Sequence, residues 1–131
     1  MNLNQINPLV FAYLGDSIYE LNIRIYLISK GISNVNDLQK TAKNFVSAKK
    51  QSLFLNELMN QNILNEDEIS IVKRARNTKT NSHPKNTDII TYKYATALEA
   101  LIGYLYLGNN KKRIDEIIEF ILKNSEENLC I

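Results

Sequence analysis

The sequence predicts an all-α protein, and three observations support this prediction. Apolar residues recur at helical spacing along most of the chain, helix-capping residues stand before these stretches, and no segment of useful length alternates between apolar and polar residues as a strand would. A length of 131 residues, with 44% hydrophobic and 23% charged residues, is typical of one soluble globular domain. We therefore expect residues 1–131 to form a single helical domain, with a loose C-terminal tail over about 124–131.

The first predicted helix begins at Asn7-Pro8 and ends at Lys30-Gly31. Asn is a favoured N-cap, Pro is tolerated in the first turn, and Gly adopts the left-handed conformation that often closes a helix. The apolar residues of this helix recur at steps of one, three and four. We therefore expect the following side chains to face the core: Leu9, Val10, Tyr13, Leu14, Ile18, Leu21, Ile25 and Ile28.

The middle of the chain contains two further predicted helices. The first covers about residues 38–59, and its pattern is compatible with a break near Ser52. Residues 60–62 have the composition of a turn. Asn65 is then the expected N-cap of the next helix. The first turn of this helix is acidic and its end, at Arg76, is basic, which is the order of charges that the helix dipole favours.

The last part of the chain is predicted to contain a polar irregular stretch at 77–88, a strongly apolar helix at about 91–107, a closing turn at 108–110 and an amphipathic helix at about 111–122. Irregular stretches of this length inside a compact domain are usually functional or disordered. Residues 77–88 are therefore a candidate binding segment.

Two carboxylates stand among the apolar residues of the first helix and of the helix at 91–107. Glu99 is the one acid of its helix, and none of its helical neighbours can neutralise it. An ionised carboxylate in apolar surroundings is costly unless it is paired or holds a metal. At 100° per residue, Asp16 falls in line with apolar residues before and after it: Leu9, Ala12, Ile23 and Leu27.

The two helices can cross beside their small residues and offer both acids to a divalent cation. Carboxylates and water are the ligands that Mg²⁺ prefers. A bound metal lowers the pKa of its water and stabilises a leaving oxygen, as phosphodiester hydrolysis requires. The alternative is that each acid pairs with a buried Arg or Lys, or caps a neighbouring helix.

Positive charge is concentrated in residues 71–93. This segment contains six basic residues and one acid, a formal charge of +5, whereas the whole chain carries +2. Such asymmetry indicates an anionic partner, and basic side chains can hold a nucleic acid backbone without reading its sequence. The alternative is a solvated basic face.

Several other chemistries are not expected. The four glycines form no phosphate-binding loop and the single histidine, His83, has no cysteine at zinc-ligand spacing, so no small-molecule cofactor and no zinc site are predicted. No apolar run is long enough to cross a membrane, and no secretory signal is visible. Together with a single cysteine, Cys130, these features favour a cytoplasmic protein without a membrane partner.

Five short motifs resemble the ribonuclease III family. Residues 14–17 (Leu-Gly-Asp-Ser) resemble the signature helix of its catalytic domain, and residues 98–103 (Leu-Glu-Ala-Leu-Ile-Gly) resemble its second acidic motif. The other three motifs lie between these two, at 46–49 (Val-Ser-Ala-Lys), 74–77 (Arg-Ala-Arg-Asn) and 84–88 (Pro-Lys-Asn-Thr-Asp). In this order the motifs are similar to those of Mini-ribonuclease III, the short form without a double-stranded-RNA-binding domain.

The resemblance implies a helical homodimer that cleaves double-stranded RNA with Mg²⁺, or with Mn²⁺ in its place, and that trims the ends of large-subunit ribosomal RNA precursors. It assigns Asp16 and Glu99 as catalytic metal ligands. Without an accessory domain, the catalytic domain itself would bind the phosphates of the RNA, and the candidates for this contact are Arg74, Arg76, Lys79 and Lys85.

The sequence departs from the larger family at three positions. Where that family has acids around the two acidic motifs, this chain has Leu9, Ala12 and Thr96. Glu20, one helical turn after the aspartate, and Asp88 are candidates to compensate as metal ligands. The alternatives are a surface salt bridge for Glu20 and a helix cap for Asp88.

The sequence thus supports three hypotheses about function. The leading one is a metal-dependent endoribonuclease. The second is a cleavage-inactive RNA-binding or ribosome-assembly module with the same fold, motivated by the missing acids, and the third is a helical protein–protein adaptor. A two-fold dimer is expected to bury some of the tyrosines that lie on very apolar helices: Tyr19, Tyr26, Tyr104 and Tyr106.

Overall fold

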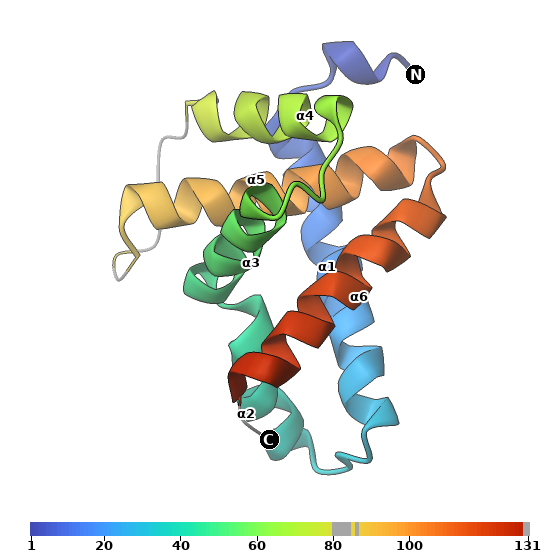
Figure 1. The fold of residues 1–131 in the computed structure, drawn as a ribbon, viewed down its shortest axis with the longest axis vertical. Helices are drawn as coiled ribbons and strands as arrows, with labels where there is room; N and C mark the ends of the chain where they lie inside the picture. The colour runs from blue at the N-terminus through green and yellow to red at the C-terminus, as the bar shows by residue number, and fades with distance from the viewer. Residues whose placement is uncertain (80–84, 86, 130–131) are drawn as a thin grey trace.

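The computed structural model describes residues 1–79, 85 and 87–129, and every regular element in this part of the chain is helical (Figure 1). A short 3-10 turn at Leu3–Gln5 precedes α1 (Pro8–Ser29), α2 (Val35–Val46) and α3 (Ala48–Asn60). The second half contains α4 (Glu66–Asn77), α5 (Ile89–Leu107) and α6 (Lys111–Leu129). The prediction of an all-α fold is confirmed.

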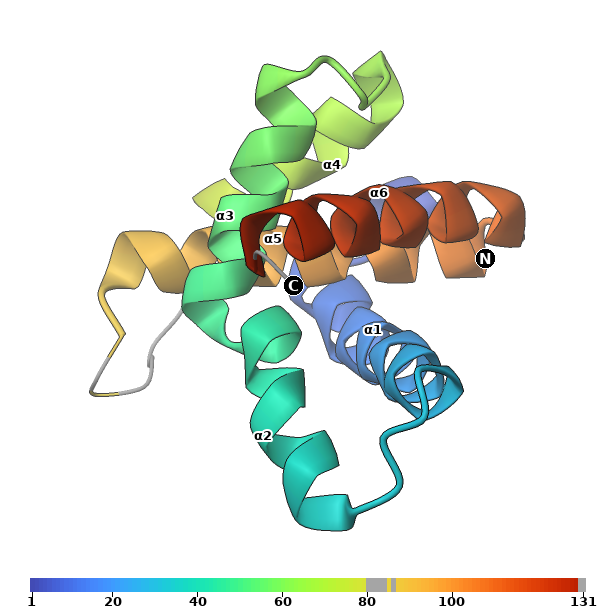
Figure 2. The same cartoon turned by 60° about the horizontal axis from the view of Figure 1, so that its bottom comes forward.

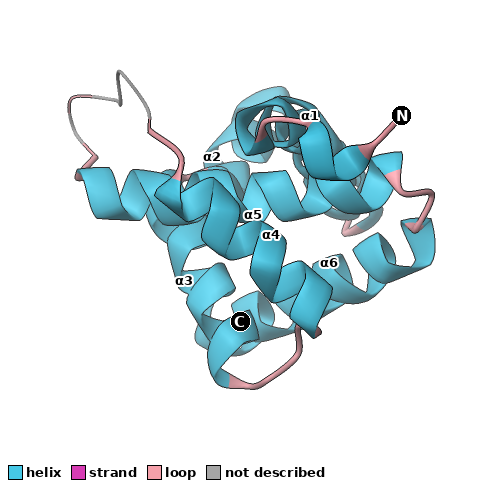
Figure 3. Cartoon of the chain, turned by 90° about the horizontal axis from the view of Figure 1, so that it is seen from above, coloured by secondary structure: helices cyan, strands magenta, loops and turns pink. Residues whose placement is uncertain are grey.

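Helix α5 is the centre of the fold. Helices α1, α3, α4 and α6 all pack against it (Figures 1 and 3). A helix that is apolar on all sides belongs in the interior of a protein, which is why this one is surrounded. Its buried residues are Ala95, Thr96, Ala97, Leu98, Ala100, Leu101, Ile102, Gly103 and Leu105.

Helix α1 crosses α5 with the two backbones in direct contact. Gly15 of α1 lies against the backbone carbonyl of Glu99, and Gly103 of α5 lies against the backbone of Phe11. A Cβ atom at either glycine would overlap those backbone atoms. The expected crossing of the two acid-bearing helices beside small residues is therefore confirmed.

The side of α1 that faces the core differs from the predicted one. Five of the eight residues expected to face the core are instead more than half exposed: Val10, Tyr13, Leu21, Ile25 and Ile28. Because α1 is apolar on both sides, its periodicity does not tell which side packs, and the close approach at Gly15 decides it. The buried residues are Pro8, Phe11, Ala12, Gly15, Tyr19, Ile23 and Leu27.

Two helix boundaries also differ from the predicted ones. Helices α2 and α3 are separated at Ser47 rather than near Ser52, because the Ser47 hydroxyl accepts a backbone N–H of the first turn and so caps α3. Helix α6 runs to Leu129, so residues 124–129 are helical rather than a loose tail. The sequence of α6 contains no Gly or Pro that would end the helix near residue 122. Figure 2 shows α2 joined to α1 by a loop and leading into α3.

Helix α4 is attached to α6 by a buried ion pair. Glu68 is only 1% exposed, and its side chain accepts hydrogen bonds from Arg113 Nε at 2.7 Å, from Arg113 Nη2 at 2.9 Å and from the Asn65 backbone at 2.9 Å. The Asn65 side chain in turn accepts the Glu68 backbone N–H, which completes a capping box. The predicted N-cap at Asn65 is confirmed, as is the one at Asn7.

The stretch between α4 and α5 is described only at 77–79, 85, 87 and 88. The expectations for the rest of that stretch, including His83, lie outside the described residues, as does Cys130. Within the described residues, no helix has both the length and the apolar character needed to cross a membrane.

Candidate functional site

Asp16 and Glu99 meet at one surface pocket. The pocket has a volume of about 490 Å³ and lies where α1 crosses α5. The two acids singled out in the sequence are therefore brought together, as expected. The remaining lining residues come from the same two helices: Leu9, Ala12, Tyr13, Leu14, Ser17, Tyr92 and Thr96.

The crossing of the two backbones determines where each carboxylate lies. Gly15, the neighbour of Asp16, rests on the backbone of Glu99 itself. Asp16 is exposed, which corrects the expectation that apolar residues surround it: Leu9 and Ala12 line the pocket instead of covering the carboxylate. Glu99 is half-buried. One acid thus reaches solvent and the other is held further inside.

The surroundings of Glu99 favour its neutral form. Burial raises the pKa of Glu99 to about 9, and a hydrogen bond with Asp16 and the negative charge of Asp16 act in the same direction. The charge of Glu20 adds to this effect, whereas the Gln51 side chain opposes it. At neutral pH, without a cation, Glu99 therefore carries a proton.

A divalent cation fits this pair of acids. The two carboxyl groups line the same pocket, and the negative charge of Asp16 disfavours ionisation of Glu99, so a cation bound by both would replace the proton. Within the described residues, no third His, Cys, Asp or Glu side chain joins them as a metal-binding group. The remaining ligands would be water molecules, which Mg²⁺ commonly retains.

Neither of the two proposed compensating acids lines this pocket. Glu20 is half-buried and forms an ion pair with Arg24, Oε2 to Nη2 at 3.3 Å, which agrees with the salt-bridge alternative. Asp88 caps α5: its carboxylate accepts the Thr91 backbone N–H at 2.9 Å and the Thr91 hydroxyl at 2.8 Å. These hydrogen bonds lower the pKa of Asp88, so the cap alternative is confirmed.

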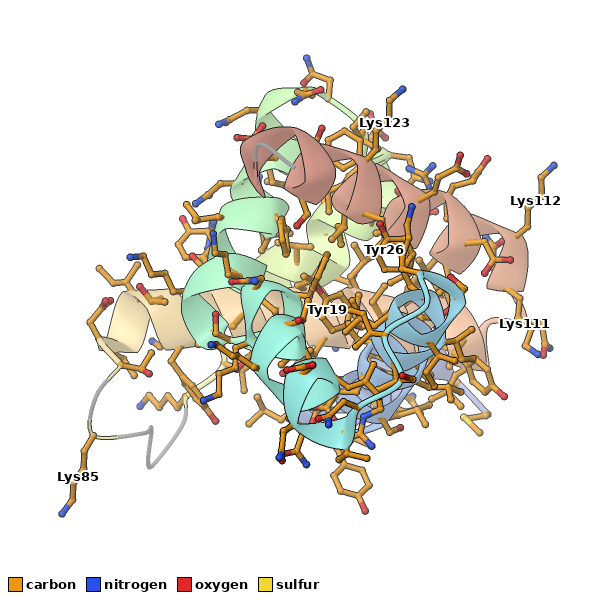
Figure 4. The ribbon with its side chains drawn as sticks, turned by 90° about the horizontal axis from the view of Figure 1, so that it is seen from below. Tyr19, Tyr26, Lys85, Lys111, Lys112 and Lys123 are labelled. Atoms are coloured by element: carbon orange, nitrogen blue, oxygen red, sulfur yellow. The ribbon has the colours of Figure 1, made fainter. Side chains whose placement is uncertain are left out.

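The four basic candidates differ in how free their side chains are. Arg74 is half-buried and donates to the carbonyl oxygen of Ile6 at 3.2 Å, so it holds the N-terminal segment against α4. Arg76 lies over the ring of Tyr94, 5.4 Å from the ring centroid. Lys79 and Lys85 are exposed, and Figure 4 shows Lys85 pointing away from the helices.

Comparison with known proteins identifies the family. Residues 9–110 match the ribonuclease III domain. The chain is 48% identical over 127 residues to Mini-ribonuclease 3 of Clostridium tetani (96% of this chain, 83% of that one) and 51% identical over 116 residues to that of Brevibacillus brevis (88% and 85%). A crystal structure of a protein from Fusobacterium nucleatum matches with a TM-score of 0.81 at 41% identity, over 92% of this chain and 94% of that one.

The chain belongs to the Mini-ribonuclease 3 group of the ribonuclease III family.

Membership of this family indicates an endoribonuclease, and it gives meaning to the residues that line the pocket. The three positions at which the sequence lacks the acids of the larger family, Leu9, Ala12 and Thr96, all line the pocket of Asp16 and Glu99. These three departures therefore lie together at the pocket. They leave the pocket with two carboxylates and several apolar walls.

The sequence reasoning missed one buried polar residue near the acid pair. Gln51 of α3 is 3% exposed, donates a hydrogen bond to the Val46 carbonyl at 3.1 Å and acts to lower the pKa of Glu99. A signal for it was present, because Gln51 lies at helical spacing with Phe54, Leu55 and Leu58, all of which are buried. A glutamine on an apolar helical stripe indicates a buried polar contact, but the sequence does not name the partner.

Proposed function

We propose that the chain is a divalent-metal-dependent endoribonuclease that cleaves double-stranded RNA, with Asp16 and Glu99 as the catalytic residues that hold Mg²⁺, or Mn²⁺ in its place. The observation that carries the proposal is the meeting of both acids in one pocket, where burial also raises the pKa of Glu99. Two acids held this way are an unfavourable arrangement for a structural role and a suitable one for a cation site.

The roles of the protein groups follow from their positions. Asp16 lies at the exposed side of the pocket, where a phosphate of the RNA can approach, and Glu99 lies further inside and releases its proton when a cation binds. When bound, the cation would activate a water molecule and stabilise the leaving oxygen of the phosphodiester. Gly15 and Gly103 keep the two helices at the spacing that brings the acids together.

Basic residues on and after α4 are proposed to hold the RNA backbone. Arg76, Lys79 and Lys85 are the favoured contacts, because Arg76 is positioned by the ring of Tyr94 and the two lysines are exposed. Arg74 is proposed as a contact in addition to its hydrogen bond with Ile6. Contacts of this kind position a duplex without reading its sequence.

A homodimer formed through the exposed side of α1 is part of the proposal. Exposed apolar side chains gathered on one helix often mark an interface. Tyr19 cannot contribute, because it is fully buried and donates a hydrogen bond to the Phe45 carbonyl at 2.8 Å. The proposed interface residues are therefore Val10, Tyr13, Leu21, Ile25 and Ile28, which are 53%, 85%, 57%, 58% and 60% exposed. Ile25→Glu is expected to turn a dimer into a monomer in sedimentation, whereas Ile90→Glu, also on the surface, leaves the mass unchanged.

The proposed cellular role is the trimming of large-subunit ribosomal RNA precursor ends in the cytoplasm. Its support is the resemblance of the five ordered motifs to Mini-ribonuclease III. In cells that lack the protein, mapping of the ends of large-subunit ribosomal RNA is expected to show extended precursors. Mature ends in normal amounts would contradict this role.

The decisive experiment is incubation of the purified protein with a long RNA duplex, with Mg²⁺ or with a chelator. Shortened products are expected only with Mg²⁺, and Asp16→Asn is expected to abolish them without loss of helical structure by circular dichroism. Asp115→Asn, which removes an exposed carboxylate from α6, is the matched control and should cleave normally.

The second candidate function is an RNA-binding module without cleavage. The observation that favours it is that only two acids line the pocket, since Leu9, Ala12 and Thr96 occupy the other positions. This candidate predicts duplex binding that weakens with salt and no products at any Mg²⁺ concentration. Cleavage that requires both Mg²⁺ and Asp16 would exclude it.

A further inference from the structure

Three surface pockets share lining residues and so form one groove. The pocket of Asp16 and Glu99, the acid pocket, adjoins a small linking pocket through three shared residues: Leu9, Tyr92 and Thr96. The linking pocket shares Thr78 with a third pocket, the α4 pocket, which has a volume of about 830 Å³ and lies between α4 and the start of α1. Helix α4 packs against both α5 and α1 (Figure 1). The groove therefore leads from the two acids to α4.

The α4 pocket is polar and basic. Lys73 is exposed, and no described residue forms an ion pair with it. Arg74 is fixed in the wall of the pocket, because its Nη2 donates to the Ile6 carbonyl oxygen at 3.2 Å. Asn77 adds an exposed amide, and Glu66 is the only described acid that lines the pocket. Lysine, arginine and asparagine side chains are common contacts to nucleic acid phosphates.

Lys93 brings positive charge into the linking pocket. It lies on α5 and lines that pocket together with Ala75 of α4 and Thr78, the residue that ends α4. Lys93 is half-buried, and no described acid forms an ion pair with its ammonium group. Partial removal of a cation from water is unfavourable unless an anion accompanies it. Packing alone therefore does not account for a lysine at this place, whereas a bound anion does.

We propose that this groove holds the backbone of the RNA strand that is cut, on one side of the scissile phosphate, with Lys93 and Lys73 as phosphate contacts. The proposal deepens the proposed function and rests on it. A strand whose phosphate lies at Asp16 and Glu99 continues over the surface in both directions, and the groove leaves the acid pocket in one of them. Lysines beyond the acid pocket complement the charge of that strand.

The groove contacts differ from those proposed for Arg76, Lys79 and Lys85. None of these three residues lines any of the three pockets. Lys93, in contrast, lies in the pocket that adjoins the two acids, so it would bind close to the cut. The groove therefore predicts a requirement for particular phosphates of one strand, which a dispersed basic face does not.

A solvated basic face is the competing explanation. Two lysines of α6 provide the reference for it, because Lys112 and Lys123 are exposed and line none of the three pockets (Figure 4). Lys73→Gln and Lys93→Gln are therefore compared with Lys112→Gln and Lys123→Gln, so that every variant loses one charge. Lys93→Arg keeps the charge and tests for rescue.

The first measurement is the affinity for a long RNA duplex in chelator, as a function of salt concentration. Each phosphate contact contributes about one unit to the slope of log affinity against log salt. Lys73→Gln and Lys93→Gln should each make the slope shallower by about one unit. Lys93→Arg and both α6 variants should keep the wild-type slope, with circular dichroism confirming that every variant is folded. Equal slopes in all four Gln variants would overturn the proposal.

The second measurement locates the contact on the RNA. A methylphosphonate, which lacks the charge of a phosphate, is placed at successive positions around the cut site in a duplex, and binding is measured in chelator. Wild type should lose affinity when the neutral group lies on one side of the cut in the cut strand. At the position that Lys93 contacts, Lys93→Gln should lose nothing further, because the coupled pair is already broken. An equal loss in wild type and Lys93→Gln at every position would contradict the assignment.

Cleavage kinetics distinguish failure of the groove from failure of the proposed function. Both groove variants are expected to raise KM for the duplex and to leave kcat unchanged at saturating duplex, because neither lysine lines the acid pocket. If wild type binds the duplex but gives no products with Mg²⁺, the proposed endoribonuclease activity is wrong and the groove proposal falls with it. If wild type cleaves and the groove variants match the α6 variants in KM and salt slope, the activity stands and the groove proposal is overturned.

Discussion

Glu68 and Glu99 are two carboxyl groups inside the same helical fold, and their surroundings drive them to opposite charge states. Burial acts to raise the pKa of Glu68, but hydrogen bonds from Arg113 and from the Asn65 backbone outweigh burial and lower it. The Glu99 side chain is more exposed than that of Glu68. Even so, burial raises the pKa of Glu99 to about 9, and its neighbour Asp16, a second acid, acts in the same direction.

The difference shows that low solvent exposure alone does not identify a functional acid. Glu68 is the less exposed of the two, yet a guanidinium and a helix N-terminus satisfy it. The structural alternative considered for the acids in the sequence, pairing with Arg or capping a helix, describes Glu68 in full. Glu68 is neutralised by the guanidinium of Arg113. Glu99 instead has a neighbouring carboxyl group, so a cation from solution would be needed to neutralise the pair.

The largest expected effect is on cleavage activity, which should depend on Glu99 and not on Glu68. Glu99→Gln is expected to reduce cleavage about a thousandfold, since a metal provides several kcal/mol of transition-state stabilisation and each 1.4 kcal/mol is a factor of ten. Glu68→Gln, assayed at a temperature at which it is folded, should cleave at nearly the wild-type rate. A comparable loss in both variants would contradict the division of roles.

For stability we expect the opposite result: substitution of Glu68 should lower the free energy of unfolding more than substitution of Glu99 does. Removal of one partner from a buried ion pair usually costs about 3–5 kcal/mol, so Glu68→Gln should lower the free energy of unfolding by roughly that amount. Chemical denaturation in chelator measures it. Glu99→Gln removes no such pair and should unfold at the wild-type denaturant concentration or above it.

The glycine contact between α1 and α5 is expected to have a somewhat smaller effect on stability. Gly15→Ala should lower the free energy of unfolding by about 2–3 kcal/mol, because the new Cβ would overlap the Glu99 carbonyl and force the helices apart. It should also weaken Mn²⁺ binding. Gly108→Ala is the control, since a Cβ there comes no closer than 3.3 Å to a neighbour, and an equal loss in both variants would exclude the crossing as the cause.

The last expected effect is a difference in pH dependence. Between its ordinary pKa of 4.5 and about 9, Glu99 holds a proton in the folded state that the unfolded chain releases, so its contribution to stability falls as pH rises. The slope is at most about 1.4 kcal/mol per pH unit. Denaturation in chelator at pH 6 and pH 8 should show this loss in wild type and not in Glu99→Gln.

The contribution of Glu68 to stability has the opposite pH dependence, and it changes at acidic pH. Because its pKa is lowered on folding, its contribution is complete above the ordinary pKa of 4.5 and is lost as pH falls through the lower, folded value. Wild type should therefore lose stability below pH 4.5 more steeply than Glu68→Gln does. Equal slopes would contradict the assignment.

Much of this arrangement could be predicted from the sequence, since it depends on local signals. The caps at Asn7 and Asn65, the wholly apolar α5 and the pairing of Asp16 with Glu99 follow from residue type and spacing. The packing side of α1 could not be predicted, because both of its sides are apolar and only the contact of Gly15 with α5 selects one. Gln51 could be recognised as buried, but its hydrogen bond to the Val46 carbonyl depends on the junction between α2 and α3, which the sequence did not locate.

The direct contact of backbones at Gly15 and Gly103 has a consequence for divergence and for design. The spacing between the two acid-bearing helices is determined by main-chain atoms rather than by the sizes of neighbouring side chains. Core residues elsewhere can therefore be exchanged, at a cost in stability alone, while the distance between the two acids is preserved. Substitution of either glycine, in evolution or in a redesigned core, would instead change the distance between the two acids.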